Sequence, residues 1–522
     1  MSTTSSRGIL GLIERVGNRL PDPVTLFAIG ALVVLLISQL GAWLEWSATN
    51  PRTDEVVVVK SLLTSDGLRW VWRSLVENFT GFAPLGVVLV AMLGIGVAER
   101  TGLINAVLER IVNLTPRSLV TPGLVFAGVM SSLATDAGYV VLPPLAAAIF
   151  ASMGRSPLAG IAAVFVGVGG GFSANLFVTA LDPLLQGATQ SAANLLDPDV
   201  VVPVTANYYF MVASTFMVTL LGWFVTDRIV ERRFSRDEVR RQIEAGEGAD
   251  RSDEEASAAS PPSTCGPLLA ASVSLVLVGA VLLAMVIVPG APLAGSHEPR
   301  PGVFVPYWSE AMVPMLFVLF LVPGIVFGIG NGTIRSDRDV ARMLAESMAS
   351  MGGYVVLAFF CGQFVAWFGE SGLGTILAIR GIEVLSAWDL PKPMLVVSII
   401  LLTALLNLFI GSASAKWFLL APVFVPLFLG LGVSPELTQA AYRVGDSTTN
   451  IIAPLNPYLV IVIVFMRRYQ KDAGIGSVLS LMLPYTIVLL VGWIAMLLVW
   501  MAFGLSLGPD TGPLFVEPMT AG

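Results

Sequence analysis

The chain alternates long apolar stretches with short polar segments. Seven of the stretches are continuous, and they approach the roughly 20 residues that an α-helix needs to cross a bilayer. They lie at Val24–Trp46, Phe82–Val97, Ala206–Val225, Leu268–Val288, Met312–Phe327, Tyr354–Trp367 and Val478–Met501. Each of these stretches predicts a transmembrane helix.

Two further apolar runs are too long for one helix and have a small, polar middle. In Thr121–Met153 the middle is Ser131–Gly138, and in Met394–Leu431 it is Gly411–Trp417. Each arm is too short to span a bilayer, and irregular backbone at membrane depth is tolerated only against protein or water. We therefore expect two re-entrant helical hairpins, at 121–153 and 394–431, that enter from opposite faces.

Each predicted hairpin is followed by a crossing that helix-breaking residues interrupt, at 157–183 and 436–466. A shift of 274 residues superimposes the two crossings and pairs Gly171 with Gly445, Ser173 with Ser447 and Asp182 with Asn456. Interrupted helices at matching positions of two halves indicate a transporter binding site. The pattern predicts an all-α polytopic membrane protein with nine transmembrane helices and two re-entrant hairpins, arranged as inverted repeats with two broken helices.

Composition supports the membrane interpretation and excludes several other functions. Hydrophobic residues make up 55% of the chain and charged residues 12%, whereas soluble domains carry about 25% charged residues. No basic patch with interleaved aromatic residues suggests nucleic-acid binding. The single histidine, His297, rules out a His-Glu-x-x-His zinc motif, and Cys265 and Cys361 do not form a metal-binding spacing. We expect no cleaved signal peptide, with the first helix acting as an uncleaved anchor.

Lysine and arginine are concentrated in alternate short loops, which predicts a cytoplasmic N-terminus and a periplasmic C-terminus. External loops are expected at Ser47–Thr80, Leu184–Val202 and Pro289–Trp308. The predicted domains are a first half at 1–230, a partly disordered cytoplasmic linker at 231–265, a second half at 266–505 and an external tail at 506–522.

Five ionisable residues are predicted at membrane depth: Asp136, Asp182, Lys416, Arg443 and Asp446. Such a residue costs about 2.5–3.5 kcal/mol at a helix centre on insertion scales, so it faces a cavity or a partner. Arg443 suits a substrate carboxylate, and Asp182 or Asp446 suits a coupling proton. Alternatively, Arg443 and Asp446 pair across one turn and only hold the broken helix, and Asp182 lies near the outer surface.

Clusters of hydroxyl and amide groups lie at both breaks and both hairpin tips. Half-helix N-termini beside them offer free N–H groups to an anion. Their oxygens also suit sodium, and the candidate ligands are Ser132, Thr135, Ser173, Asn175, Ser447 and Asn450. The alternative is that these side chains cap hairpin tips and allow close helix packing. Trp417 either stacks on an aromatic ligand or packs as an ordinary core residue.

Three segments together resemble the AbgT family of p-aminobenzoyl-glutamate transporters. They are GGGFSANLFVTALDP at 169–183, RVGDSTTNIIAPLNPY at 443–458 and GSASAKW at 411–417. The resemblance implies a homodimer in a bacterial inner membrane. It also implies transport of p-aminobenzoyl-glutamate or related folate breakdown products, and export of sulfonamide antimetabolites. The family's channel residues would be Asp182, Ser414, Trp417, Arg443, Asp446 and Pro454.

We therefore expect a secondary transporter of aromatic carboxylates, driven by a proton or sodium gradient because no ATP-binding motif is present. No cofactor is expected apart from bound sodium. A sodium-coupled dicarboxylate transporter or a cation antiporter would also suit oxygen-rich hairpins. A distant alternative is a membrane-embedded enzyme with a dyad of Lys416 and either Ser412 or Ser414. A purely structural scaffold leaves the repeated breaks unexplained.

Overall fold

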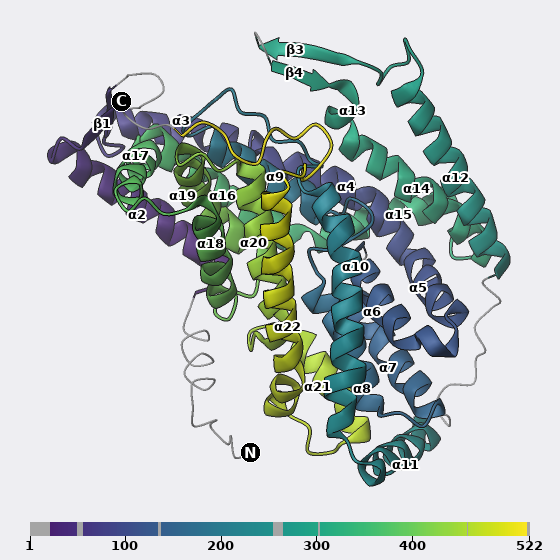
Figure 1. Ribbon diagram of the computed structural model, residues 1–522. Coiled ribbons are helices and arrows are strands. Elements are labelled where there is room, and N and C mark those ends of the chain that lie inside the picture. Colours follow the sequence, from purple (N-terminus) through teal and green to yellow (C-terminus); the bar gives the residue numbers. More distant parts are fainter. Residues whose placement is uncertain are drawn as a thin grey trace.

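The computed structural model describes residues 21–49, 56–133, 137–253, 265–300, 303–456 and 458–518. Thr135, Asp136 and Pro457 lie outside these residues. The first half contains α2 (Pro23–Trp43), α3 (Ser65–Thr80), α4 (Ala83–Arg100), α5 (Leu103–Leu114), α6 (Val120–Met130), α7 (Ala137–Ser152), α8 (Pro157–Phe165), α9 (Leu181–Ala193) and α10 (Tyr208–Val225). The molecule is a bundle of helices, with short strands at the upper end and α11 (Arg236–Asp253) at the lower end of Figure 1.

The second half repeats this helical character. It contains α12 (Cys265–Ile287), α13 (Tyr307–Glu310), α14 (Met312–Asn331), α15 (Asp337–Ser350), α16 (Gly352–Glu370), α17 (Leu373–Ser386), α18 (Lys392–Leu406), α19 (Ala413–Gly430), α20 (Pro435–Thr449), α21 (Tyr458–Tyr469) and α22 (Ile475–Ala502). In Figure 1, α20 and α22 lie near the centre, with α2 and α16–α19 on one side and α4–α8 with α12 and α14 on the other.

Eight helical segments in the described part of the chain are long and apolar enough to cross a membrane. Seven coincide with the seven predicted continuous crossings. The eighth, α19 (Ala413–Gly430), belongs to the predicted second hairpin. The halves of the broken helices are shorter, so their length and composition do not identify them as membrane-crossing helices. The total of nine crossings and two hairpins therefore stays a prediction.

A pair of helices lies at each predicted hairpin. The first helix pair is α6 and α7, with a 3₁₀ turn at Ser131–Leu133, and the second is α18 and α19. Each pair packs against the helix that follows it, α8 or α20. A Cβ atom on Gly167 would lie 2.3 Å from the Val125 carbonyl oxygen, and one on Gly445 would lie 2.4 Å from that of Ile400. Gly167 belongs to η3, the π-helical turn Val166–Gly170, and it lets the backbone of this turn approach that of α6 closely. Gly445 does the same for α20 and α18.

Both crossings that follow the pairs are interrupted. α8 runs into the π-helical turn at Val166–Gly170, and helix resumes at Leu181. α20 ends in a 3₁₀ turn at Asn450–Ile452, and helix resumes at Tyr458. The Ser173 backbone N–H donates to Ser447 Oγ at 3.1 Å, across a separation of 274 residues. This contact supports the repeat, because equivalent residues of two related halves meet where the halves face each other.

The structure corrects three sequence-based predictions. Leu184–Val202 is not a simple external loop, because α9 continues to Ala193 and buries small and apolar side chains against α4 and α19. Ser47–Thr80 contains the strand pair β1 (Ser47–Thr49) and β2 (Val56–Val58) and then α3, whose N-terminus Thr64 caps.

The third correction concerns the predicted linker at 231–265. Residues 254–264 are outside the described part, but α11 (Arg236–Asp253) is helical and packs against α8 and α21. Ser156 Oγ donates to Gln242 Oε1 at 2.6 Å, which ties α11 to the start of α8. The expected outer loop Pro289–Trp308 carries the strand pair β3 (Ser296–Arg300) and β4 (Val303–Pro306).

Candidate substrate and ion site

The polar centre of the molecule is built on α20. Ser434 caps this helix, Pro435 begins it, and all fifteen of its residues are buried. Helical spacing places Gln439, Tyr442, Arg443 and Asp446 within two turns on neighbouring faces. A buried helix with this many polar side chains requires partners for them, and those partners come from α9, α10 and α19 and from Asn407 just after α18.

Arg443 pairs with Asp182 of the first half. Arg443 Nη2 lies 2.5 Å from Asp182 Oδ1, and both side chains are almost completely buried. Asp182 Oδ2 accepts from the backbone N–H of Thr179 at 2.6 Å and from its hydroxyl at 2.9 Å. Asp182 therefore lies in the protein interior. Arg443 Nε is buried with no hydrogen-bond partner among the described residues.

Asp446 pairs with Lys416 at the start of α19. Lys416 Nζ donates to Asp446 Oδ1 and to Asn407 Oδ1, and Lys416 and Asp446 are buried. The alternative that Arg443 and Asp446 pair across one turn is therefore wrong, because each has its own partner on another element. The second carboxylate oxygen, Asp446 Oδ2, is buried and has no partner within the described residues.

The two ion pairs make the centre electrically balanced. It holds two cations, Arg443 and Lys416, and two anions, Asp182 and Asp446. Removing one member of a buried pair leaves an uncompensated charge, which typically costs about 3–5 kcal/mol. A charged ligand can enter without that cost only if a pair opens and a compensating proton or ion enters with it.

Trp417 is fully buried between the halves. Its indole Nε1–H donates to Thr189 Oγ1 at 3.0 Å and to the Leu185 carbonyl at 3.2 Å. Its ring lies against Tyr442, with 4.4 Å between ring centroids and an interplanar angle of 32°. In this conformation the indole of Trp417 connects α9, through its hydrogen bonds, to α20, through its contact with the Tyr442 ring.

Four of the predicted sodium ligands contact one another in pairs. Asn175 Nδ2 donates to Ser132 Oγ at 2.9 Å, and Ser173 meets Ser447 as described above. Asn450 Nδ2 lies 3.4 Å from the Gly169 carbonyl oxygen, which links the second break to the first. No group of three or more His, Cys, Asp or Glu side chains suited to a metal ion occurs among the residues that the structure describes.

Ser414 and Pro454 lie at the edge of this centre. Ser414 Oγ is 3.2 Å from Ser412 Oγ, and Ser412 caps α19 by accepting from the Ala415 N–H. The Lys416 ammonium donates to Asp446 and Asn407. Pro454 is half-buried in the second break, next to Leu455, whose carbonyl oxygen would lie 3.1 Å from a Cβ on Gly411.

Three buried polar residues at this centre were missed by the sequence analysis. Asn407 Nδ2 donates to the Asp446 carbonyl, Thr449 Oγ1 and Asn450 Oδ1, at 2.6, 2.9 and 2.9 Å. Thr189 Oγ1 lies 2.7 Å from Gln439 Oε1. An available signal was the isolated asparagine in an otherwise apolar stretch before the hairpin tip. Gln439, one turn before Arg443 on the same helix, was a second signal of a buried polar centre.

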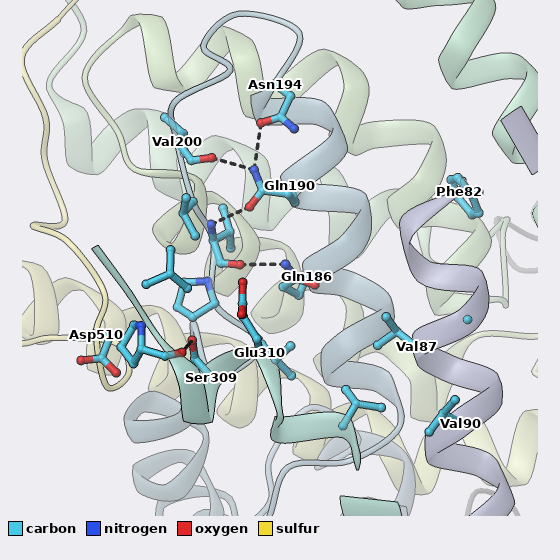
Figure 2. Close-up of a pocket in the computed structure, with 18 of the residues that line it drawn as sticks. Phe82, Val87, Val90, Gln186, Gln190, Asn194, Val200, Ser309, Glu310 and Asp510 are labelled. Carbon is cyan, nitrogen blue, oxygen red and sulfur yellow. Dashed lines mark hydrogen bonds between the residues drawn. The ribbon is translucent and has the colours of Figure 1, made fainter. Parts of the chain in front are cut away.

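A separate open cavity of about 780 Å³ lies beside α4 and α9 (Figure 2). Gln190 donates to the Val200 carbonyl and accepts from the Val202 N–H, so it fixes the segment that forms one wall. Glu310 and Asp510 are its charged groups, and its described lining contains no lysine or arginine. This cavity offers nothing to attract a carboxylate, so the buried ion pairs are the better candidate for substrate chemistry.

The whole chain is similar in sequence and in fold to known proteins. Residues 8–515 match the model of the AbgT putative transporter family. The chain belongs to the AbgT transporter family. It is 35% identical over 514 residues to the p-aminobenzoyl-glutamate transport protein of Escherichia coli K12, covering 98% of each chain.

Two solved structures of transport proteins are also similar. The YdaH transporter of Alcanivorax borkumensis is 45% identical with a TM-score of 0.85, over 94% of this chain and all of that one. MtrF of Neisseria gonorrhoeae, described with a class of antimetabolite efflux pumps, is 41% identical with a TM-score of 0.86. The match covers 97% of this chain and 100% of MtrF. The resemblance seen in the sequence is confirmed. This AbgT protein is a multi-pass membrane transporter and not a membrane-embedded enzyme.

Proposed function

We propose that this AbgT transporter is a secondary transporter of p-aminobenzoyl-glutamate or related aromatic carboxylates and exports sulfonamide antimetabolites. A proton or sodium gradient drives the cycle. The relatives support the substrate class, since one is a p-aminobenzoyl-glutamate transport protein and another is described among antimetabolite efflux pumps.

The observation that carries the proposal is the buried Arg443–Asp182 pair, which joins the two halves at the broken helices. A guanidinium is a fork of donors that matches a carboxylate, and Asp182 occupies part of that fork. A substrate carboxylate replaces Asp182 as the partner of Arg443. Protonation of Asp182 removes the competing charge and keeps the centre balanced, so proton uptake and substrate binding are coupled.

The substrate ring is assigned to Trp417. Its indole contacts Tyr442 in this conformation, and an aromatic ligand inserts beside it when α19 moves relative to α20. Ser414 and Pro454 line the approach from the second break, and Asp446 is the alternative proton carrier. Sodium, if it is the coupling ion, binds the oxygens of Ser132, Thr135, Ser173, Asn175, Ser447 and Asn450.

Reconstituted transport tests the assignment. Proteoliposomes are given labelled p-aminobenzoyl-glutamate or labelled succinate, under an imposed proton gradient and with sodium or choline outside. We expect gradient-dependent flux of p-aminobenzoyl-glutamate, competed by sulfonamides and lost in Arg443→Ala. Flux of succinate alone, driven by sodium, would instead establish the dicarboxylate alternative. Normal flux in Arg443→Ala would remove the assigned role of the arginine.

The cellular setting is part of the same proposal. The protein is a homodimer in a bacterial inner membrane, with its N-terminus in the cytoplasm and its C-terminus in the periplasm. Chemical labelling of single cysteines placed at Asp237 and at Asp510 tests the orientation, since α11 and the C-terminal segment lie at opposite ends in Figure 1. Labelling of both from the same side contradicts the assigned topology.

A further inference from the structure

The ammonium of Lys416 lies among oxygen atoms at the junction of α18, α19 and α20. Its partners are the Asp446 carboxylate and the side-chain oxygen of Asn407. The Asn407 amide nitrogen is held by three oxygens on α20 and the break that follows it, and this fixes the amide oxygen toward Lys416. The Tyr442 hydroxyl lies 3.4 Å from the same carboxylate oxygen of Asp446.

Carboxylate, amide and hydroxyl oxygens are the ligands that hard metal cations prefer. Asp446 Oδ2 is buried beside the ammonium and has no partner in the described structure, so the junction has unused capacity for a cation. A lysine ammonium is a compact point charge, which makes it a substitute for a monovalent metal ion. We propose that the junction is a cation site that Lys416 fills, and that it accepts sodium when the ammonium is absent or withdrawn.

In the first half, the described contact between the hairpin tip and the interrupted helix is neutral, since Asn175 Nδ2 donates to Ser132 Oγ at 2.9 Å. The second half has a neutral contact of the same kind, from Asn407 Nδ2 to Thr449 Oγ1 at 2.9 Å. The pair of Lys416 and Asp446 is additional to it. Asp136 of the first tip lies outside the described residues.

A purely structural ion pair is the competing explanation, and it makes a different prediction. If Lys416 only bridges α19 and α20, its removal destabilises the protein equally in every salt. If it fills a cation site, sodium takes over its charge in a variant that lacks the ammonium. The inference deepens the proposed function by naming an ion site, yet it is tested without transport and stands or falls separately from the substrate.

The experiment measures thermal unfolding of the purified full-length protein in sodium chloride and in choline chloride at equal ionic strength. Lys416→Ala is compared with the unmodified protein. We expect the midpoint of Lys416→Ala to rise by about 2 °C or more, saturably, when sodium replaces choline. The rise exceeds any sodium response of the unmodified protein, and it disappears in Lys416→Ala/Asp446→Asn, which lacks the carboxylate.

Lys392→Ala is the matched control, because Lys392 donates to the carbonyl oxygens of Gly432 and Val516 rather than to a carboxylate. It should respond to sodium as the unmodified protein does. An equal sodium response with and without Lys416, or one that survives Asp446→Asn, overturns the proposal. If Lys416→Ala is not recovered, Lys416→Met takes its place. Failure of both to fold in sodium also overturns the proposal, since sodium would then not replace the ammonium.

Discussion

The two halves of this transporter share a pattern of elements but differ in chemistry. In each, a helix pair precedes an interrupted helix, and a glycine allows the first helix of the pair to approach that helix. The described contact at the first junction is that of Asn175 with Ser132, whereas the second junction holds the charged pair of Lys416 and Asp446 beside the neutral contact of Asn407 with Thr449. Among the described residues, the charged pair is therefore what distinguishes the second junction from the first.

Arg443 and Asp182 connect these unequal halves. The arginine comes from the second interrupted helix, and the aspartate comes from the segment after the first interruption. Each half supplies one charge, so neither half can neutralise its own. The pair is thus the point at which relative movement of the halves would have the largest electrostatic effect.

The largest expected effect comes from breaking that connection. Asp182→Leu leaves the buried Arg443 guanidinium unpaired and should lower the free energy of unfolding by about 3–5 kcal/mol. Asp182→Leu/Arg443→Met removes both charges and should recover most of that loss, while transport stays absent in both variants. Denaturant titration in micelles measures the stability. Equal destabilisation by the single and double variants would show that packing, rather than charge, dominates the contact.

The second effect tests the feature that the halves share. Gly445→Ala places a Cβ 2.4 Å from the Ile400 carbonyl oxygen, and Gly167→Ala places one 2.3 Å from that of Val125. Each should cost about 1–3 kcal/mol, because a well-packed helix contact must move apart. Gly279→Ala is the control, since no atom lies within 4 Å of its added Cβ, and its change should stay within about 0.5 kcal/mol. Similar costs at all three glycines would contradict the close approach.

The repeat and the apolar crossings were predictable because they depend on patterns along the chain. The seven continuous crossings follow from stretches near the length that spans a bilayer, and the interruptions follow from glycine, proline and small polar residues. α9 was not predicted, since its buried face consists of small residues such as Ala188 and Ala192, which have little hydrophobic signal. α3 and α11 were treated as loop and linker because their composition is polar.

The buried charged residues were singled out individually in the sequence, but their pairing was not. Asp182, Lys416, Arg443 and Asp446 are ionisable residues within or beside apolar stretches. Their partners depend on which elements meet in space, and the pairing of Arg443 with Asp446, which the sequence left open as an alternative, does not occur. Asn407 was missed because a single amide in an apolar run carries little information until its neighbours are known.

A smaller effect separates the two contributions of Trp417. Trp417→Phe keeps an aromatic ring beside Tyr442 but removes the N–H that donates to Thr189 and Leu185 on α9. We expect a loss of about 1 kcal/mol in the free energy of unfolding, the usual value of a buried hydrogen bond. Transport should fall less than in Trp417→Ala if the ring is what binds the substrate. Equal loss of transport in both variants would assign the role to the indole N–H instead.

A further effect concerns the bases of the two helix pairs, where a cationic side chain links the ends of the two helices in each pair. Arg155, just after α7, donates to Thr121 near the start of α6 and to the carboxylates of Asp227 and Glu231. Lys392, at the start of α18, donates to the carbonyl oxygens of Gly432, just after α19, and of Val516. The first base holds charged partners and the second holds neutral ones, which is the reverse of the described tip contacts, neutral for Asn175 with Ser132 and charged for Lys416 with Asp446.

This reversal gives a graded prediction for unfolding in micelles. Arg155→Ala should cost about 1–2 kcal/mol, since it removes charge-assisted hydrogen bonds from a partly exposed site where solvent weakens each of them. Lys392→Ala should cost less than about 1 kcal/mol, because only neutral carbonyl groups lose a donor. High salt should reduce the first loss and leave the second nearly unchanged. An equal salt dependence for the two variants would mean that the charge on the partners does not distinguish the two bases.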